Sequence, residues 1–90
     1  MEIKYSKDFI KHFQKRIPAG SLLDQRFQER LGIFITNRTN PIIKDHKLVG
    51  KKQGYRSFSI TADVRVIYSL EENDSAIFID IGTHNQVYGK

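Results

Sequence analysis

The sequence predicts an α+β fold in which an N-terminal strand and an α-helical hairpin pack on a small, mainly antiparallel β-sheet, in the order β-α-α-β-β-β. Three observations support this prediction. Apolar residues recur at helical spacing between Ser6 and Asn37, with one break at residues 18–20. After Pro41 the spacing changes to two, which is typical of strands. The chain has 90 residues, enough for one core but not for a second, so residues 1–90 form a single domain.

The first part of the chain carries clear signals for the ends of its elements. Residues 2–5 alternate polar and apolar side chains and predict a short strand. Ser6 can cap a helix that runs to about Ile17, and Ser21 can cap a second one, with Asp24 as a weak capping-box partner. Because Pro-Ala-Gly separates them, the two helices should form an antiparallel hairpin. Their buried faces should contain Phe9, Ile10, Phe13 and Ile17, then Leu23, Phe27, Leu31, Phe34 and Ile35.

The alternating second half predicts a β-hairpin followed by a last strand. A turn centred near Ala62 pairs Phe58 with Val66 and Ser59 with Arg65, which gathers the apolar pairs on one face. A turn over residues 71–75 then leads into a buried strand over residues 76–81. The residues expected to face the helices are Val64, Val66, Tyr68 and Leu70. Those expected on the open face are Ser59, Asp63 and Arg65.

Composition excludes several classes of protein. The chain has no cysteine, which excludes disulfides and thiolate metal sites and favours the reducing cytoplasm. No apolar run approaches the roughly 20 residues needed to span a bilayer. No glycine-rich phosphate loop, nucleophile elbow or paired metal-ligand spacing is found. If the protein is an enzyme, acid–base chemistry without a metal or cofactor is the option that remains.

Positive charge is concentrated in one part of the chain. The formal net charge is +5, and residues 1–56 hold 13 Lys and Arg against 5 Asp and Glu. The basic segment 38–56 would attract a polyanion such as RNA, although a solvated loop explains the charge equally well. The candidate RNA-binding residues are Lys44, Lys47, Lys51, Lys52 and Arg56.

A few residues in the second half have side chains suited to chemistry on a phosphodiester. Arg65 can bind phosphate oxygens through two N–H groups, or simply pair with Asp63. His84 follows the last strand, where Gly82 permits an abrupt change of direction, and an imidazole can act as general acid or base. Tyr88 can stack on a base or anchor the C-terminus on the core. His46 lies within the basic segment, and His12 shows nothing beyond a position on a helix surface.

These residues together resemble the RelE/ParE superfamily of bacterial toxin–antitoxin toxins, and within it the YafQ-like ribosome-dependent mRNA interferases. The resemblance covers essentially the whole chain. The most specific match is Gly-Thr-His followed by Val-Tyr near the C-terminus, after an Arg-Val-Ile-Tyr strand. The matching segments are residues 5–9, 45–48, 54–56, 63–68, 81–84 and 87–88.

The resemblance implies a RelE-like toxin that cuts messenger RNA in the ribosomal A site by attack of a ribose 2′-hydroxyl on the adjacent phosphate. His46, Asp63, His84 and Tyr88 match YafQ-type active-site positions, and Arg65 matches a phosphate-binding arginine of RelE-type members. The implied roles are Asp63 or His46 as base and His84 as acid, with Arg65 and His84 meeting over one phosphate. No metal is needed. Implied partners are the ribosome, mRNA and a cognate antitoxin with acidic residues, which can form a higher-order toxin–antitoxin complex.

The chain departs from the YafQ-like pattern at one position. Ser59 stands where these members carry a further histidine, and serine is no base at neutral pH without an activating partner. Either His46 and Asp63 take over, or activity is reduced, or cations such as Arg56 assist in the RelE manner, although the register turns Arg56 toward the helices. Two other functions fit the same fold or charge: a ParE-like toxin that poisons DNA gyrase, and a non-catalytic RNA- or ribosome-binding module.

Overall fold

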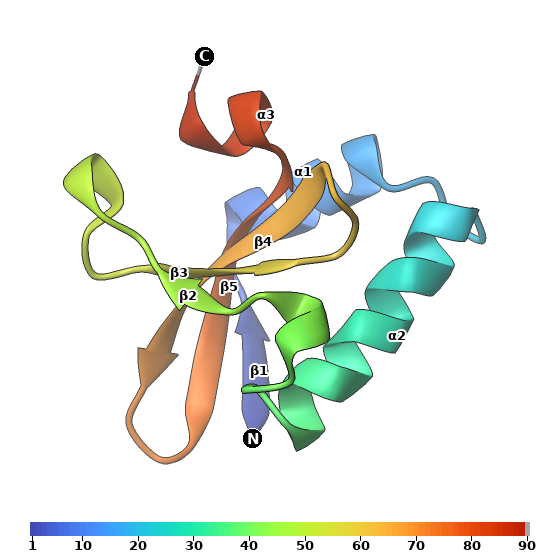
Figure 1. Cartoon of the computed structure of the whole chain (residues 1–90). Helices are drawn as coiled ribbons and strands as arrows, with labels where there is room; N and C mark the ends of the chain where they lie inside the picture. Colours follow the sequence, from blue (N-terminus) through green and yellow to red (C-terminus); the bar gives the residue numbers. More distant parts are fainter. Residues whose placement is uncertain (90) are drawn as a thin grey trace.

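The sheet of the computed structural model, which describes residues 1–89, has five strands in the order β1-β5-β4-β3-β2 (Figure 1). β1 pairs with β5 in parallel, and the other three pairings are antiparallel. The α+β prediction is therefore confirmed, while β2, α3 and two 3₁₀ turns are additions to it. The strands are β1 Glu2–Tyr5, β2 His46–Lys47, β3 Arg56–Ser59, β4 Val64–Glu71 and β5 Ser75–Thr83. The helices are α1 Lys7–Arg16, α2 Leu22–Thr36 and α3 His84–Tyr88, with 3₁₀ turns η1 Pro41–Ile43 and η2 Gly50–Lys52.

The helices α1 and α2 begin where their capping residues predict. The Ser6 hydroxyl accepts a hydrogen bond from the Phe9 N–H at 3.0 Å, and the Ser21 hydroxyl accepts from the Asp24 N–H at 3.1 Å. Asp24 does not complete a capping box, because its carboxylate accepts from the Gly20 N–H at 2.9 Å instead. No helix within residues 1–89 is both long and apolar enough to cross a membrane.

Aromatic side chains hold the helices on the sheet, with α2 beside it and α1 behind it in Figure 1. The ring of Phe34 stacks on Phe58 at 4.6 Å between centroids and meets Tyr68 edge-on at 4.8 Å. Two predicted core residues are instead exposed, Ile10 by 48% and Ile35 by 42%. Each lies one residue, or about 100° around its helix, from a phenylalanine that points into the core, so it turns toward solvent.

The predicted register of the β3–β4 hairpin is confirmed. Phe58 pairs with Val66 and Ser59 pairs with Arg65. Val64, Val66 and Tyr68 are buried as predicted, but Leu70 is 44% exposed because it lies beyond Tyr68, next to the β4–β5 turn. A β-bulge follows in β5, which shifts the register between Ile67 and Tyr68.

Candidate functional site

A cleft of about 630 Å³, here called the β2–α3 cleft, lies between the β2–η2 segment and α3. Figure 1 shows the η2 loop and α3 projecting near the upper end of the sheet in that view. No carboxylate is among its lining residues, so the cleft is cationic. Residues predicted from distant parts of the chain meet here. The lining consists of His46, Leu48, Val49, Lys51, Lys52, Arg65, His84, Gln86, Val87, Tyr88 and Gly89.

Arg65 is the half-buried cation of the β2–α3 cleft. It lies in the middle of the sheet, directly opposite Ser59 on β3 and Gly82 on β5. Its Nε is buried and has no hydrogen-bond partner within residues 1–89. The alternative ion pair with Asp63 is not formed in this part of the chain. Because buried N–H groups normally have partners, this guanidinium is suited to an anion in the cleft.

The helix α3 carries His84 and Tyr88 into the cleft. Their positions are four residues apart, which places both side chains on one face, and their ring centroids are 4.5 Å apart. Thr83 caps the helix in a reciprocal capping box, where Thr83 N–H donates to Gln86 Oε1 at 2.8 Å and Gln86 N–H donates to Thr83 Oγ1 at 3.3 Å. The spacing Thr-x-x-Gln is the sequence signal that could have predicted this helix.

Gly82 serves close packing at the start of α3 and does not provide the turn that the sequence suggested. The residue lies within β5, and the change of direction comes after it, at Thr83. A Cβ atom on Gly82 would lie 2.6 Å from Gln86 Oε1 and 2.8 Å from Arg16 Nη1. The absent side chain therefore lets Gln86 fold back onto the sheet and close its capping box.

Replacing Thr83 with alanine is expected to lower the free energy of unfolding by about 1 kcal/mol, because an N-cap hydrogen bond is lost. For a domain of this size, the melting temperature should fall by roughly 4–8 °C. Thermal unfolding followed by circular dichroism measures the change. Thr83→Ser keeps the capping oxygen and should restore most of the stability. Equal losses in both variants would contradict the capping role.

The imidazole of His46 is held by its own loop. Its Nδ1 lies 2.8 Å from the backbone carbonyl of Lys44, which adopts a left-handed conformation with φ 50°. In the neutral ring, Nδ1–H donates to this carbonyl and leaves the lone pair of Nε2 free to accept a proton. His46 is exposed at the sheet edge, opposite Ser57. The geometry suits a general base.

A buried charge cluster fixes the residue that precedes His46. The side chain of Asp45 is 6% exposed and accepts hydrogen bonds from Arg38 Nη1 at 2.9 Å, Arg56 Nη2 at 3.1 Å and the Tyr68 hydroxyl. The hydrogen bond to Asp45 raises the pKa of Arg56. Sequence reasoning did not find this cluster, although Asp45 is the only carboxylate in the basic segment 38–56.

Burial of the phenol, together with its hydrogen bond to Asp45, raises the pKa of Tyr68 to about 12. The native state therefore keeps the phenolic proton at pH values where the unfolded chain, with a pKa near 10, has lost it. Stability from this group is complete below about pH 10 and is lost as the pH rises to about 12, a loss of about 2 to 3 kcal/mol. Urea unfolding at several alkaline pH values checks this. Tyr68→Phe should show a flatter decline, and an unchanged slope would contradict it.

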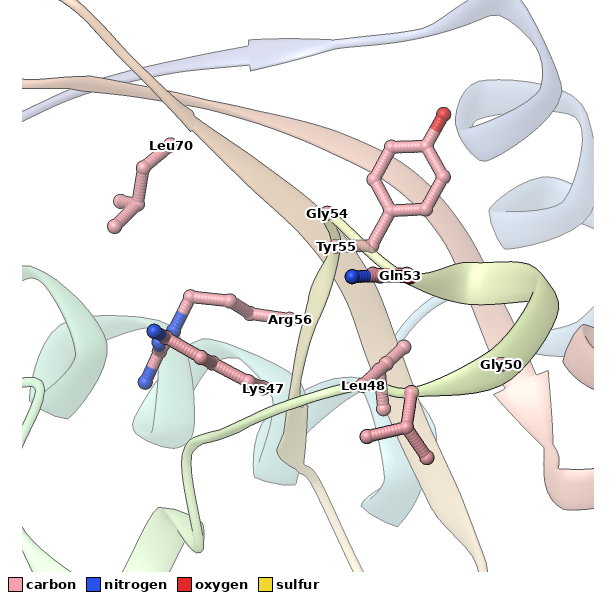
Figure 2. Close-up of a pocket in the computed structure, with 9 residues that line it drawn as sticks. Lys47, Leu48, Gly50, Gln53, Gly54, Tyr55, Arg56 and Leu70 are labelled. Atoms are coloured by element: carbon pink, nitrogen blue, oxygen red, sulfur yellow. The ribbon is translucent and has the colours of Figure 1, made fainter.

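Other predicted site residues lie outside the β2–α3 cleft. Asp63 is exposed in the β3–β4 turn, where its N–H donates to Thr61 Oγ1 at 3.2 Å. Lys47 and Arg56 line a separate hollow of about 660 Å³, in which their side chains extend from neighbouring strands and Tyr55 points away (Figure 2). Arg56 faces the helix side, as its register indicated, and binds Asp45, so the structure does not place it among the cations of the cleft.

Two further observations concern histidines and metal ligands. His12 does more than occupy a helix surface, because its Nδ1 lies 2.6 Å from Asp80 Oδ1 and links α1 to β5. This contact corrects the sequence interpretation, which could not see a partner 68 residues away. Within residues 1–89, no three His, Asp or Glu side chains are grouped so that they could hold a metal ion.

Comparison with known proteins gives a consistent result. Residues 1–89 match the family described as "Bacterial toxin of type II toxin-antitoxin system, YafQ". YafQ from E. coli strain BL21(DE3) is 27% identical with a TM-score of 0.76, and the match covers 98% of each chain. The E. coli DinJ-YafQ complex gives 28%, 0.73 and 98% of each chain. A copper-bound mutant toxin from Helicobacter pylori gives 27% and 0.77, covering 97% of this chain and 98% of that one. No curated protein sequence matches the chain.

Proposed function

The chain belongs to the YafQ family of type II toxin–antitoxin toxins, and from this premise we propose that it is a ribosome-dependent endoribonuclease that cleaves messenger RNA in the cytoplasm. One observation carries the proposal: Arg65 and His84, from separate strands of the sequence pattern, line the same cationic cleft. A guanidinium and an imidazole facing one space are the groups that phosphodiester cleavage requires. The known fold alone would not imply this chemistry.

The proposed reaction is an attack within the substrate. The ribose 2′-oxygen forms a bond to the adjacent phosphorus while the bond from phosphorus to the 5′-oxygen breaks, which leaves a 2′,3′-cyclic phosphate and a 5′-hydroxyl. His46 Nε2 takes the 2′-proton, and His84 donates a proton to the leaving oxygen. Arg65 stabilises the negative charge that grows on the phosphate oxygens. Because the nucleophile belongs to the substrate, the proposed step uses no metal.

Of the two residues proposed as base, His46 has the better position. It lines the cleft with its Nε2 unengaged, whereas Asp63 is exposed in a turn outside the cleft. Ser59, which stands at the position of the extra family histidine, lies next to Arg65 and supplies only a hydroxyl. Tyr88, whose ring lies against His84, is proposed to stack on a base of the messenger and keep the imidazole in place.

Lys51 and Lys52 are proposed to steer RNA into the cleft, since both line it. A cognate antitoxin is the other proposed partner, because solved relatives include a DinJ-YafQ complex. The antitoxin would neutralise the toxin by laying a segment with Asp or Glu across the cationic β2–α3 cleft. A higher-order assembly of such pairs is part of this proposal.

Primer extension on a translated messenger tests the function. We expect cuts that appear only when ribosomes are present and that disappear with His84→Gln or His46→Ala, while Asp63→Ala stays active. Cleavage of free RNA would contradict the ribosome requirement. Intact messenger together with inhibited DNA gyrase would replace the proposal with the ParE-like alternative.

A further inference from the structure

A second cationic hollow lies outside the β2–α3 cleft, at the end of the β3–β4 hairpin. This α2 hollow has a volume of about 350 Å³ and is bounded by α2, the segment before β2 and the hairpin turn. Two arginines and one lysine contribute to its wall, and no carboxylate does. Its lining residues are Arg26, Arg30, Ile42, Lys44, Ser59, Thr61 and Ala62.

The charges of the α2 hollow are incompletely balanced. Arg26 Nε and Arg30 Nε approach one carboxylate, Glu29, at 3.6 and 3.5 Å, and Glu29 itself is 60% exposed outside the lining. Lys44 adds a third cation. Three cations therefore share a single carboxylate, which leaves two positive charges to attract an anion.

The remaining polar groups of the α2 hollow are arranged as donors. Arg30 Nη1 donates to the Ile42 carbonyl at 3.2 Å, which fixes the guanidinium against the wall. The Thr61 oxygen already accepts from the Val64 N–H at 3.0 Å, so its hydroxyl proton is directed elsewhere. Ser59 adds a second hydroxyl. Guanidinium, ammonium and hydroxyl donors around one space suit an anion with several acceptor oxygens, such as a phosphodiester.

The α2 hollow and the β2–α3 cleft are joined at two points. Ser59, in the wall of the hollow, pairs directly with Arg65, which lines the cleft, and paired residues on neighbouring strands share a face. Lys44 lines the hollow while its carbonyl holds His46 of the cleft. An RNA strand bound at one site therefore has a continuous path to the other.

From this arrangement we propose that the α2 hollow binds an RNA phosphate other than the one that is cleaved. The inference rests on the proposed function, because it assumes that the β2–α3 cleft holds the scissile phosphate. Contacts of this kind carry no sequence information and fix the register of the bound strand. The phosphate comes either from the strand that is cut or from structured ribosomal RNA, and the two sources can be separated.

The test removes two cations from the α2 hollow. The variant Arg26→Gln with Lys44→Asn changes exposed or partly exposed side chains, and asparagine tolerates the left-handed backbone at residue 44. Lys7→Gln with Lys11→Gln is the matched control, because it removes the same charge from exposed positions of α1. The probe is a single-stranded oligoribonucleotide with one 2′-deoxyribose at the cut site, which the toxin cannot cleave. Binding is measured at several salt concentrations, and binding to purified ribosomes is measured in parallel.

We expect the α2-hollow variant to bind RNA about tenfold more weakly than the control at low salt. Its salt dependence should fall by roughly 0.7 per lost phosphate contact on a single strand. A loss with the oligoribonucleotide assigns the phosphate to the cleaved strand, and a loss with ribosomes alone assigns it to ribosomal RNA. Equal binding by variant and control in both assays would overturn the inference.

Two further outcomes separate this inference from its neighbours. If the variant loses affinity for the acidic antitoxin while RNA binding matches the control, the hollow is an antitoxin contact and the inference is wrong. If the unaltered protein fails to cleave translated messenger but the variant still binds RNA more weakly than the control, the proposed function fails and the phosphate site stands.

Discussion

Replacing Arg65 with alanine is expected to slow cleavage of translated messenger about 100- to 1000-fold, the usual cost of removing a donor from developing negative charge. The half-buried guanidinium faces the β2–α3 cleft, and its Nε has no partner within residues 1–89. Its hydrogen-bonding capacity is therefore free for substrate. The rate of appearance of cut messenger, followed by primer extension in a ribosome-containing translation mixture, measures the effect.

Two controls make this result specific to the chemistry. Arg65→Lys keeps the charge but loses the planar pair of donors, so it should recover only part of the rate. Because Arg65 makes no ion pair in the described chain, its removal should change stability little, and the melting temperature of Arg65→Ala reports this. Normal cleavage by a folded Arg65→Ala protein would remove Arg65 from the mechanism. A collapse in melting temperature would mean that the residue is structural.

Asp45→Ala is expected to lower the free energy of unfolding by about 3 to 5 kcal/mol, the largest stability effect that this structure predicts. The carboxylate is 6% exposed and compensates two guanidinium groups, Arg38 and Arg56, which the substitution would leave facing each other. Small domains have only about 5 to 15 kcal/mol of stability in total, so much of the protein would be unfolded. Urea denaturation monitored by tyrosine fluorescence measures the change.

Asp63→Ala is the matched control for Asp45→Ala, because it removes an exposed carboxylate from the β3–β4 turn. Its effect should remain within about 0.5 kcal/mol, as for most surface substitutions. If Asp45→Ala is too unstable to purify, Tyr68→Phe removes a single donor from the cluster and should give a smaller, measurable loss of about 1 kcal/mol. Equal stabilities of the Asp45 and Asp63 variants would contradict the structural role of the cluster.

The Asp45 cluster also connects stability to the site. It ties the segment before β2 to β3 and β4, and the next residue is His46, the proposed base. The two-residue strand β2 lies at the edge of the sheet, where few hydrogen bonds fix a backbone. We infer that the buried charges supply the rigidity that the short strand lacks.

The sequence by itself determined the features that depend on neighbours along the chain. Ser6 and Ser21 begin the helices, because a capping hydroxyl reaches an N–H only three residues ahead. The alternation around Ala62 set the pairing of Ser59 with Arg65, because a shift of one residue would turn the apolar side chains to the wrong face. The fold order and the open-face position of Arg65 followed from these local patterns.

Only the tertiary structure decided which distant residues meet. It joined His46 to His84 in one cleft, left Asp63 outside, and turned Arg56 toward Asp45. It also paired β1 with β5 in parallel, although the two strands lie at opposite ends of the chain. Periodicity reports which face of an element is apolar, but the packing of several elements around one core fixes how those faces are placed relative to one another. Partners far apart in sequence, such as Asp45 and Tyr68, are set by that packing.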